Sequence, residues 1–198
     1  MADGREIHVW DAHAEECREQ NRTPFEFYED SWLRQQRVAL GGITTVLDVG
    51  CGPGYWIKLF EGLDYTGVDQ SPGMLALAQE LSPLAKFVLG NARSLSEVFP
   101  PGSFDLAFTS SVLQHNRHIP DKQEVVEQIA LVLRGGGYLL CTENTYRADN
   151  CPESVNNPSF TDGYTFTPTG WEIFMKALGF RLLAYNGQSE YLYQKVRK

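Results

Sequence analysis

Residues 46–55 read VLDVGCGPGY, an apolar run that leads directly into three glycines, Gly50, Gly52 and Gly54. The apolar run is typical of a buried strand. Glycine allows positive φ and lets a ligand approach the main chain, while the amide groups at the start of a following helix attract polar ligands. The stretch therefore predicts a strand, a tight turn and a helix that together bind a nucleotide-type ligand.

The spacing of these glycines differs from that of a dinucleotide site. Such a site has the pattern G-x-G-x-x-G, whose last glycine allows the helix and strand to pack closely around a pyrophosphate. Counting from Gly50, that last position holds Tyr55, and Pro53 removes one amide donor from the turn. A nicotinamide-dependent oxidoreductase is therefore a less favoured alternative.

A second apolar strand, YTGVDQS at residues 65–71, contains Asp69 where the strand ends. A carboxylate at this strand end can accept hydrogen bonds from both hydroxyls of a ribose. Alone, an aspartate in such a place is usually a helix cap or part of a solvated turn. Because it follows the glycine turn at this distance, we expect Asp69 to bind a ribose.

The whole chain alternates between short apolar runs and longer runs of helical periodicity, the pattern of βαβ units in an α/β fold. Ser71–Pro72 and Thr167–Pro168 mark helix starts, and Gly179 marks a helix end. The expected strands are 45–49, 65–69, 86–89, 104–109, 137–143, 180–185 and 191–196, and the expected helices are 54–61, 72–81, 122–133 and 168–178.

Residues 8–40 are predicted to form one or two helices with a high aromatic content. Two interpretations stay open: the segment closes over a ligand pocket, or its rings pack on the sheet edge. The aromatic residues are Trp10, Phe25, Phe27, Tyr28 and Trp32.

Length and composition favour one domain. The 198 residues contain no repeat or flexible linker, so we expect a single domain over 1–198, with an N-terminal helical cap at 1–42 and an α/β core at 43–198. Acidic residues outnumber basic ones by 25 to 17, and no basic run is present, which argues against long nucleic acid as a partner. The apolar stretches are too short to span a bilayer, so no membrane partner is expected.

Four cysteines are scattered along the chain without a CxxC pair, so no metal site is expected. We interpret them as reduced thiols that fill apolar space in a cytoplasmic protein. They are Cys17, Cys51, Cys141 and Cys151. The oligomeric state is not indicated by the sequence.

The motifs together resemble those of a known family. Asp48-x-Gly50-x-Gly52-x-Gly54 and Asp69 are followed by KFVLGNA at 86–92, FDLAFTSSVLQH at 104–115 and VLRGGGYLLCTEN at 132–144. This order and spacing, over roughly residues 44–185, resemble the class I S-adenosylmethionine-dependent methyltransferases of the small-molecule type. The resemblance implies a Rossmann-like α/β fold whose seven-stranded, mostly parallel sheet has the order 3-2-1-4-5-7-6. Strand 7 would be antiparallel, and helices would cover both faces.

The resemblance also implies S-adenosylmethionine as cofactor and S-adenosylhomocysteine as its product. Gly50 and Gly52 would pass beneath the methionine part of the cofactor, and Asp48 would order its amino group directly or through water. Asp69 would hold the ribose. The implied set further includes Gly54, Gln70 and Ser110.

The adenine contacts implied by the resemblance come from two further segments. Met74 would pack against the adenine face, although a core position in an amphipathic helix is nearly as good an explanation. Asn91 and the Ala92 amide would read the adenine edge. The family usually has aspartate where this chain has Asn91, whose amide oxygen can still accept a hydrogen bond from the exocyclic amine.

Methyl transfer is an in-line displacement, so the enzyme mainly aligns the acceptor and excludes water, adding a base when the acceptor has a proton to lose. His115 is the first candidate base, because neutral imidazole accepts a proton near neutral pH. The alternative is that His115 supports the pocket wall. Glu143 is the second candidate. His13, His118 and Tyr28 follow.

Residues 144–166 form a long polar segment after the fifth strand, and loops of this length are commonly lids or binding segments, although polar loops are also simply solvated. Enzymes that methylate DNA bases typically carry an Asn/Asp-Pro-Pro-aromatic motif after strand four, where this chain has Thr109-Ser110-Ser111-Val112. The sequence therefore predicts methyl transfer to a polar small molecule, with oxygen as acceptor and nitrogen as the alternative. A non-catalytic cofactor-binding partner subunit is a further alternative.

Overall fold

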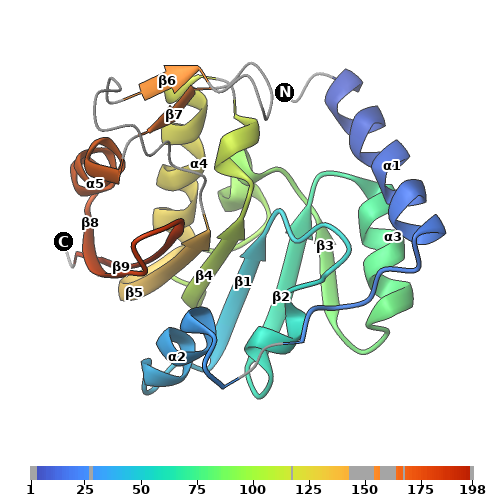
Figure 1. Cartoon of the computed structure of the whole chain (residues 1–198), viewed down its shortest axis with the longest axis horizontal. Helices are drawn as coiled ribbons and strands as arrows, with labels where there is room; N and C mark the ends of the chain where they lie inside the picture. The colour runs from blue at the N-terminus through green and yellow to red at the C-terminus, as the bar shows by residue number, and fades with distance from the viewer. Residues whose placement is uncertain are drawn as a thin grey trace. The chain divides into compact units, whose positions relative to one another are not determined.

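The computed structural model describes residues 4–26, 29–116, 118–142, 154–156, 164–166 and 168–196. Seven strands form one sheet in the order β3-β2-β1-β4-β5-β9-β8, and β6 pairs with β7 separately (Figure 1). Counted along the chain, the seven sheet strands have the order 3-2-1-4-5-7-6. The seventh is antiparallel to its neighbours, so the fold implied by the family resemblance is confirmed.

The strands are β1 (Thr45–Val49), β2 (Asp64–Asp69), β3 (Lys86–Leu89), β4 (Phe104–Ser110), β5 (Leu133–Thr142), β6 (Ser154–Asn156), β7 (Tyr164–Phe166), β8 (Phe180–Tyr185) and β9 (Glu190–Lys195). The α-helices are α1 (Gly4–Glu19), α2 (Trp32–Ala39), α3 (Pro72–Leu81), α4 (Ile119–Val132) and α5 (Pro168–Ala177). Three 3₁₀ helices are η1 (Ile57–Phe60), η2 (Ala92–Glu97) and η3 (Leu113–His115).

The chain divides into two compact units, residues 1–92 and 93–198. In the first unit, β1, β2 and β3 pair in parallel, with Asp48 opposite Gly67 and Asp69 opposite Leu89. Parallel strands end at one edge of a sheet, so the residues that follow β1, β2 and β3 lie along that edge. Helix α1 runs beside α3 (Figure 1).

In the second unit, β4 pairs with β5 in parallel, and β9 pairs antiparallel with both β5 and β8. Helix α4 buries one apolar face, as its helical spacing predicts. Helix α5 buries Trp171, whose ring lies 5.5 Å from the ring of Phe166. The buried apolar residues of α4 are Val125, Val126, Ile129 and Val132.

Helix α3 illustrates why several boundaries could be predicted from sequence. Ser71 is its N-cap and accepts a hydrogen bond from the Met74 amide at 3.1 Å, while Pro72 occupies the first turn. The predicted bounds of α3, β1, β3 and β8 agree with the structure. Helix α5 ends before Gly179, whose φ of +84° is the left-handed conformation expected after a helix. The expected cap at Thr167 lies outside the described residues.

The predicted helix at 54–61 is wrong, because the structure contains only η1 there. Between the end of β1 and the start of β2, the chain must return to the opposite edge of the sheet within residues 50–63. The glycine turn occupies the first of these residues. A 3₁₀ helix rises about 2.0 Å per residue, against about 1.5 Å for an α-helix, so it spans the return with fewer residues. Strand β5 also begins earlier than predicted, at Leu133, directly after α4.

Candidate functional site

The glycine turn after β1 is built from main-chain conformations that favour glycine. Gly50, Gly52 and Gly54 have φ values of +67°, +51° and +75°. The amides of Gly50 and Cys51 both donate to the carbonyl of Val68, at 2.8 and 3.0 Å, which fixes the turn to β2. Residues other than glycine adopt such φ values only with strain. The alternate spacing of the three glycines in the sequence therefore matches the positions at which the backbone of the turn has positive φ.

Two of these glycines have different surroundings. A Cβ atom on Gly52 would have only the Met74 sulfur, at 4.0 Å, within reach. A Cβ atom on Gly54 would approach the Phe87 ring at 3.2 Å and Ala78 at 3.7 Å. Gly52 therefore faces open space that a ligand could use, whereas Gly54 allows β3 and α3 to pack closely against the turn.

Asp69 connects the glycine turn with the start of α3. Its Oδ2 accepts a hydrogen bond from the Gly52 amide at 2.9 Å, and its Oδ1 accepts one from the Ser71 amide at 2.9 Å. A carboxylate has about four lone-pair sites, so capacity remains for a ligand hydroxyl. Burial raises the pKa of Asp69, and the amide hydrogen bonds oppose that rise.

Asp48 is the most deeply buried acidic group of this edge, with 1% of its surface exposed. Its Oδ2 accepts a hydrogen bond from the Tyr65 hydroxyl at 2.8 Å. Burial raises the pKa of Asp48 to about 7, while the Tyr65 hydrogen bond acts in the opposite direction. The sequence prediction missed Tyr65, although the pairing of β1 with β2, which sets Tyr65 opposite Val46, was the signal that could have indicated it.

The remaining predicted cofactor residues of the first unit follow β2 and β3. Met74 is buried, and its sulfur borders the space at Gly52. The Asn91 side-chain amide donates to the Gln70 side-chain oxygen at 3.1 Å, and η2 begins at Ala92. The structure thus brings the ends of β1, β2 and β3 together with the residues that the resemblance assigns to the cofactor. Their role in binding stays a prediction.

The second unit holds Ser110 and His115. Ser110, the last residue of β4, accepts a hydrogen bond from the Thr142 hydroxyl at 2.8 Å. His115 is half-buried in η3, and its Nε2 lies 3.5 Å from the Gln114 side-chain nitrogen. Ser111, between them, has φ +61°, which is uncommon for a residue other than glycine.

Two side chains donate hydrogen bonds to main-chain carbonyls of the turn that contains His115. Lys122 of α4 is buried, with 1% of its surface exposed, and donates to the carbonyl of Leu113. The Asn116 side chain donates to the carbonyl of Val112 at 3.0 Å. The sequence prediction missed Lys122, because a lysine in the first turn of a helix is usually solvated.

The other catalytic candidates have varied positions. His13, on α1, pairs with Glu16 at 3.0 Å, and His118 is exposed before α4. Glu143 and Tyr28 lie outside the described residues, as does most of the predicted substrate segment 144–166. Within that segment the structure describes only β6 and β7.

Other expectations concern metals, thiols and membranes. The described ranges contain no group of three or more His, Cys, Asp or Glu side chains that could hold a metal ion. Cys17, Cys51 and Cys141 are buried and free, and Cys151 lies outside the described residues. None of the helices in the described part of the chain is both long and apolar enough to cross a membrane.

Comparison with known proteins agrees with this geometry. Residues 47–141 match the model of a family described as a methyltransferase domain. The 2-methyl-6-phytyl-1,4-hydroquinone methyltransferase of a Synechocystis strain is 37% identical over 112 residues, which are 54% of this chain and 34% of that protein. A trans-aconitate 2-methyltransferase of an Enterobacter strain is 30% identical over 127 residues, covering 62% of this chain and 45% of that protein.

A solved structure extends the similarity beyond the matched residues. The S-adenosylmethionine-dependent methyltransferase from Methanosarcina mazei superposes with a TM-score of 0.68 at 19% identity, covering 88% of this chain and 100% of that chain. In the sequence of residues 47–141 and in its fold, the chain is similar to the class I S-adenosylmethionine-dependent methyltransferases. The cofactor of this methyltransferase family is S-adenosylmethionine. The matches span less than half the length of the two curated relatives, at 34% and 45%.

Proposed function

We propose that this methyltransferase transfers a methyl group from S-adenosylmethionine to an oxygen atom of a polar small molecule. One observation carries the cofactor part of the proposal. The Asp69 carboxylate bonds the Gly52 amide at 2.9 Å, beside a glycine whose Cβ direction is open apart from the Met74 sulfur. A ligand with a ribose next to a group that needs close approach to the main chain fits this arrangement.

The residues of the first unit suit the parts of this cofactor. Asp69 can accept a hydrogen bond from a ribose hydroxyl, and the carboxyl of Asp48 can attract an ammonium group. Met74 offers a polarisable sulfur to a flat ring, and Asn91 offers an amide to its edge. When bound, S-adenosylmethionine supplies the methyl group of its sulfonium for an in-line displacement by the acceptor atom.

The second unit offers a candidate base. The half-buried His115 imidazole lies on a turn that Lys122 and Asn116 hold in place. A neutral imidazole in such a position can take the proton of an acceptor hydroxyl. Glu143 follows β5 directly in the sequence and is the alternative base.

The names of the relatives support a small-molecule acceptor. One acts on a hydroquinone and the other on trans-aconitate. The polar sequence of residues 144–166 supports a polar acceptor for this chain as well. We further propose that the protein works in the cytoplasm, which the scattered cysteines favour.

The cofactor proposal is tested by calorimetric titration with S-adenosylmethionine, S-adenosylhomocysteine and, as the control ligand, NADH. We expect binding of the first two and none of NADH. The acceptor is then found by incubating the protein with methyl-labelled cofactor and fractionated metabolite extract, with mass spectrometry of the labelled product. A label on nitrogen or carbon would overturn the choice of oxygen. Cofactor binding without turnover across all fractions would instead indicate a non-catalytic subunit.

A further inference from the structure

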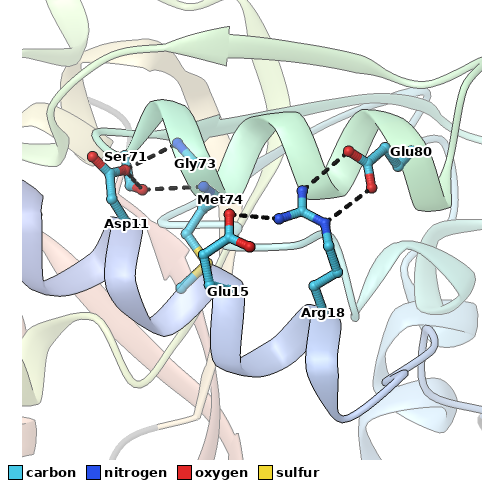
Figure 2. Close-up of polar contacts among 7 residues, drawn as sticks. All are labelled: Asp11, Glu15, Arg18, Ser71, Gly73, Met74 and Glu80. Atoms are coloured by element: carbon cyan, nitrogen blue, oxygen red, sulfur yellow. Dashed lines mark hydrogen bonds and ion pairs between the residues drawn. The ribbon is translucent and has the colours of Figure 1, made fainter.

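Helix α1 is attached to α3 at two places, shown in Figure 2. At one end, Asp11 of α1 meets the first turn of α3. At the other end, Arg18 of α1 bonds both carboxylate oxygens of Glu80, at 3.0 and 3.4 Å, and also pairs with Glu15 of its own helix at 2.6 Å. The two attachments differ in their distance along α3 from Asp69, which lies three residues before the first residue of that helix.

The Asp11 attachment is made by one carboxylate oxygen. Oδ1 of Asp11 accepts a hydrogen bond from the Ser71 hydroxyl at 2.5 Å and another from the Gly73 amide at 2.9 Å. The Ser71 oxygen in turn accepts from the Met74 amide at 3.1 Å. Two of the amide groups that have no partner within α3 are therefore satisfied, one by Asp11 directly and one through Ser71. The hydrogen bonds from Ser71 and Gly73 lower the pKa of Asp11, so its carboxylate stays ionised.

The sequence of α3 makes room for this contact. A Cβ atom on Gly73 would lie 2.9 Å from Oδ1 of Asp11, closer than real Cβ atoms come, and 3.2 Å from the Cα of Asp11, which would have to shift. Glycine costs about 1 kcal/mol relative to alanine inside a helix. The close approach of α1 gives a physical reason for glycine at this position, since any other residue would push Asp11 away.

Ser71 also connects Asp11 to the glycine turn. While its hydroxyl donates to Asp11, its main-chain amide donates to Oδ1 of Asp69, and Oδ2 of Asp69 accepts from the Gly52 amide. The result is a continuous chain of hydrogen bonds from α1 through the start of α3 to the turn after β1. A displacement of Asp11 would free the Ser71 hydroxyl to rotate and would loosen the amide that orients the Asp69 carboxylate.

A second contact of the N-terminal segment reaches the same turn. Cys17 of α1 packs with Tyr55 and Leu77 in a buried apolar cluster, and the Phe25 amide donates to the Tyr55 carbonyl at 2.8 Å. Tyr55 directly follows Gly54. The N-terminal segment therefore touches two segments of the first unit that adjoin the candidate cofactor site, the start of α3 and the end of the glycine turn.

We propose that Asp11 is a positioning residue of the cofactor site, which couples the docking of α1 on α3 to the binding of the adenosyl ribose by Asp69. This inference rests on the proposed function, because it requires that Asp69 bind the cofactor. By linkage, docked α1 strengthens cofactor binding, and bound cofactor strengthens the docking of α1 by the same factor.

The experiment compares Asp11→Ala with Arg18→Gln, the matched control, which breaks the other attachment of the same helix. S-adenosylhomocysteine is titrated calorimetrically into each folded protein well below its melting temperature. We expect Asp11→Ala to weaken binding about five- to thirtyfold, and Arg18→Gln to weaken it less than about twofold. Asp11→Asn, which keeps an acceptor oxygen for Ser71 and Gly73, should recover much of the affinity and covers the case in which Asp11→Ala fails to fold.

Amide hydrogen exchange supplies a second readout that does not depend on turnover. S-adenosylhomocysteine should slow exchange in residues 4–19 of the wild type and of Arg18→Gln, but not of Asp11→Ala. Equal affinities of Asp11→Ala and wild type would overturn the inference, as would equal losses in Asp11→Ala and Arg18→Gln. A wild type that does not bind S-adenosylhomocysteine would instead refute the proposed function itself, so the two failures are distinguishable.

Discussion

The turn after β1 and the turn after β4 both follow the carboxyl end of a buried parallel strand, yet they are held by different kinds of contact. In the first, main-chain amides are the donors: the turn has glycines at positive φ, the Gly50 and Cys51 amides donate to the Val68 carbonyl, and the Gly52 amide donates to the Asp69 carboxylate. In the second, side chains donate in addition to main-chain amides, with Lys122 on the Leu113 carbonyl and Asn116 on the Val112 carbonyl.

This difference suits the two tasks proposed for the turns. A cofactor that is common to a whole family can be held by backbone geometry, which many sequences can provide. An acceptor that differs between relatives requires side chains that can change without altering the fold. Substitutions in the two turns should therefore differ in effect, on catalysis in the turn after β4 and on cofactor binding in the turn after β1.

Replacing His115 tests whether the turn after β4 takes part in chemistry. If His115 is the base, His115→Ala should lower turnover about a hundredfold to ten-thousandfold while the affinity for S-adenosylhomocysteine stays nearly unchanged. His118→Ala is the matched control, because that histidine is exposed before α4, and its turnover should equal that of the wild type. Steady-state kinetics and calorimetry measure the two quantities. Preserved turnover with a lower melting temperature would make His115 a structural residue and leave Glu143 to be tested.

Replacing Gly52 tests whether the turn after β1 depends on its backbone. Gly52→Val places a branched side chain at φ +51°, in the space proposed for the cofactor, and should weaken binding by more than about a hundredfold. Gly42→Val is the control, since Gly42 has φ +74° and open surroundings. Both variants should lose stability from strain, roughly 1 to 2 kcal/mol, but only Gly52→Val should lose binding. Normal binding by Gly52→Val would show that the cofactor does not approach this turn.

The pH dependence of cofactor affinity tests whether the buried Asp48 carboxyl contacts the cofactor. The pKa of Asp48 is raised by burial to about 7, so the protonated form predominates below that pH. The ammonium group of the cofactor favours the ionised form, so affinity for S-adenosylhomocysteine should be about tenfold lower at pH 6 than at pH 8. Asp48→Asn should remove this dependence. Tyr65→Phe should move its midpoint to higher pH, because the Tyr65 hydrogen bond favours the carboxylate.

The raised pKa of Asp48 also makes the free energy of unfolding depend on pH in the absence of cofactor. Because its folded pKa lies above the unfolded value of about 3.9, Asp48 favours folding most at pH values below about 4. That contribution is lost as the pH rises from about 4 through about 7. Urea unfolding of the wild type and Asp48→Asn across this range should show a difference in unfolding free energy that changes with pH. A constant difference would contradict the raised pKa.

The comparison of the two turns also explains which features could be predicted from sequence. The turn after β1 is specified by three glycines at alternate positions and by a strand that ends at Asp69, so local patterns were sufficient. The cap of α3 was equally local, since Ser71 and Pro72 adjoin each other. The missed contacts join distant residues: Asp11 lies sixty positions from Ser71 in the sequence. No local pattern specifies such a pair, because it depends on how α1 packs.

The failed prediction at residues 54–61 has a geometric cause. Apolar residues at helical spacing indicated an α-helix, but the short connection between β1 and β2 allows only η1. Near His115, the bracing by Lys122 depends on the packing of α4 against η3, which the periodicity of either segment does not reveal. The 3₁₀ helix η1 and the Lys122 contact therefore depend on how elements connect and pack, which local sequence patterns do not specify.

Binding of the cofactor ribose by Asp69 can be tested by a calorimetric cycle. S-adenosylhomocysteine and an analogue without the ribose 2′-hydroxyl are titrated into the wild type and into Asp69→Ala. Asp69→Ala should weaken binding of the parent compound about tenfold to a hundredfold, because hydrogen bonds to a charged group contribute roughly 1.5 to 3 kcal/mol. The wild type should bind the analogue more weakly than the parent compound, whereas Asp69→Ala should bind both equally. If Asp69→Ala binds as tightly as the wild type, or still distinguishes the two compounds as the wild type does, Asp69 is not the ribose ligand.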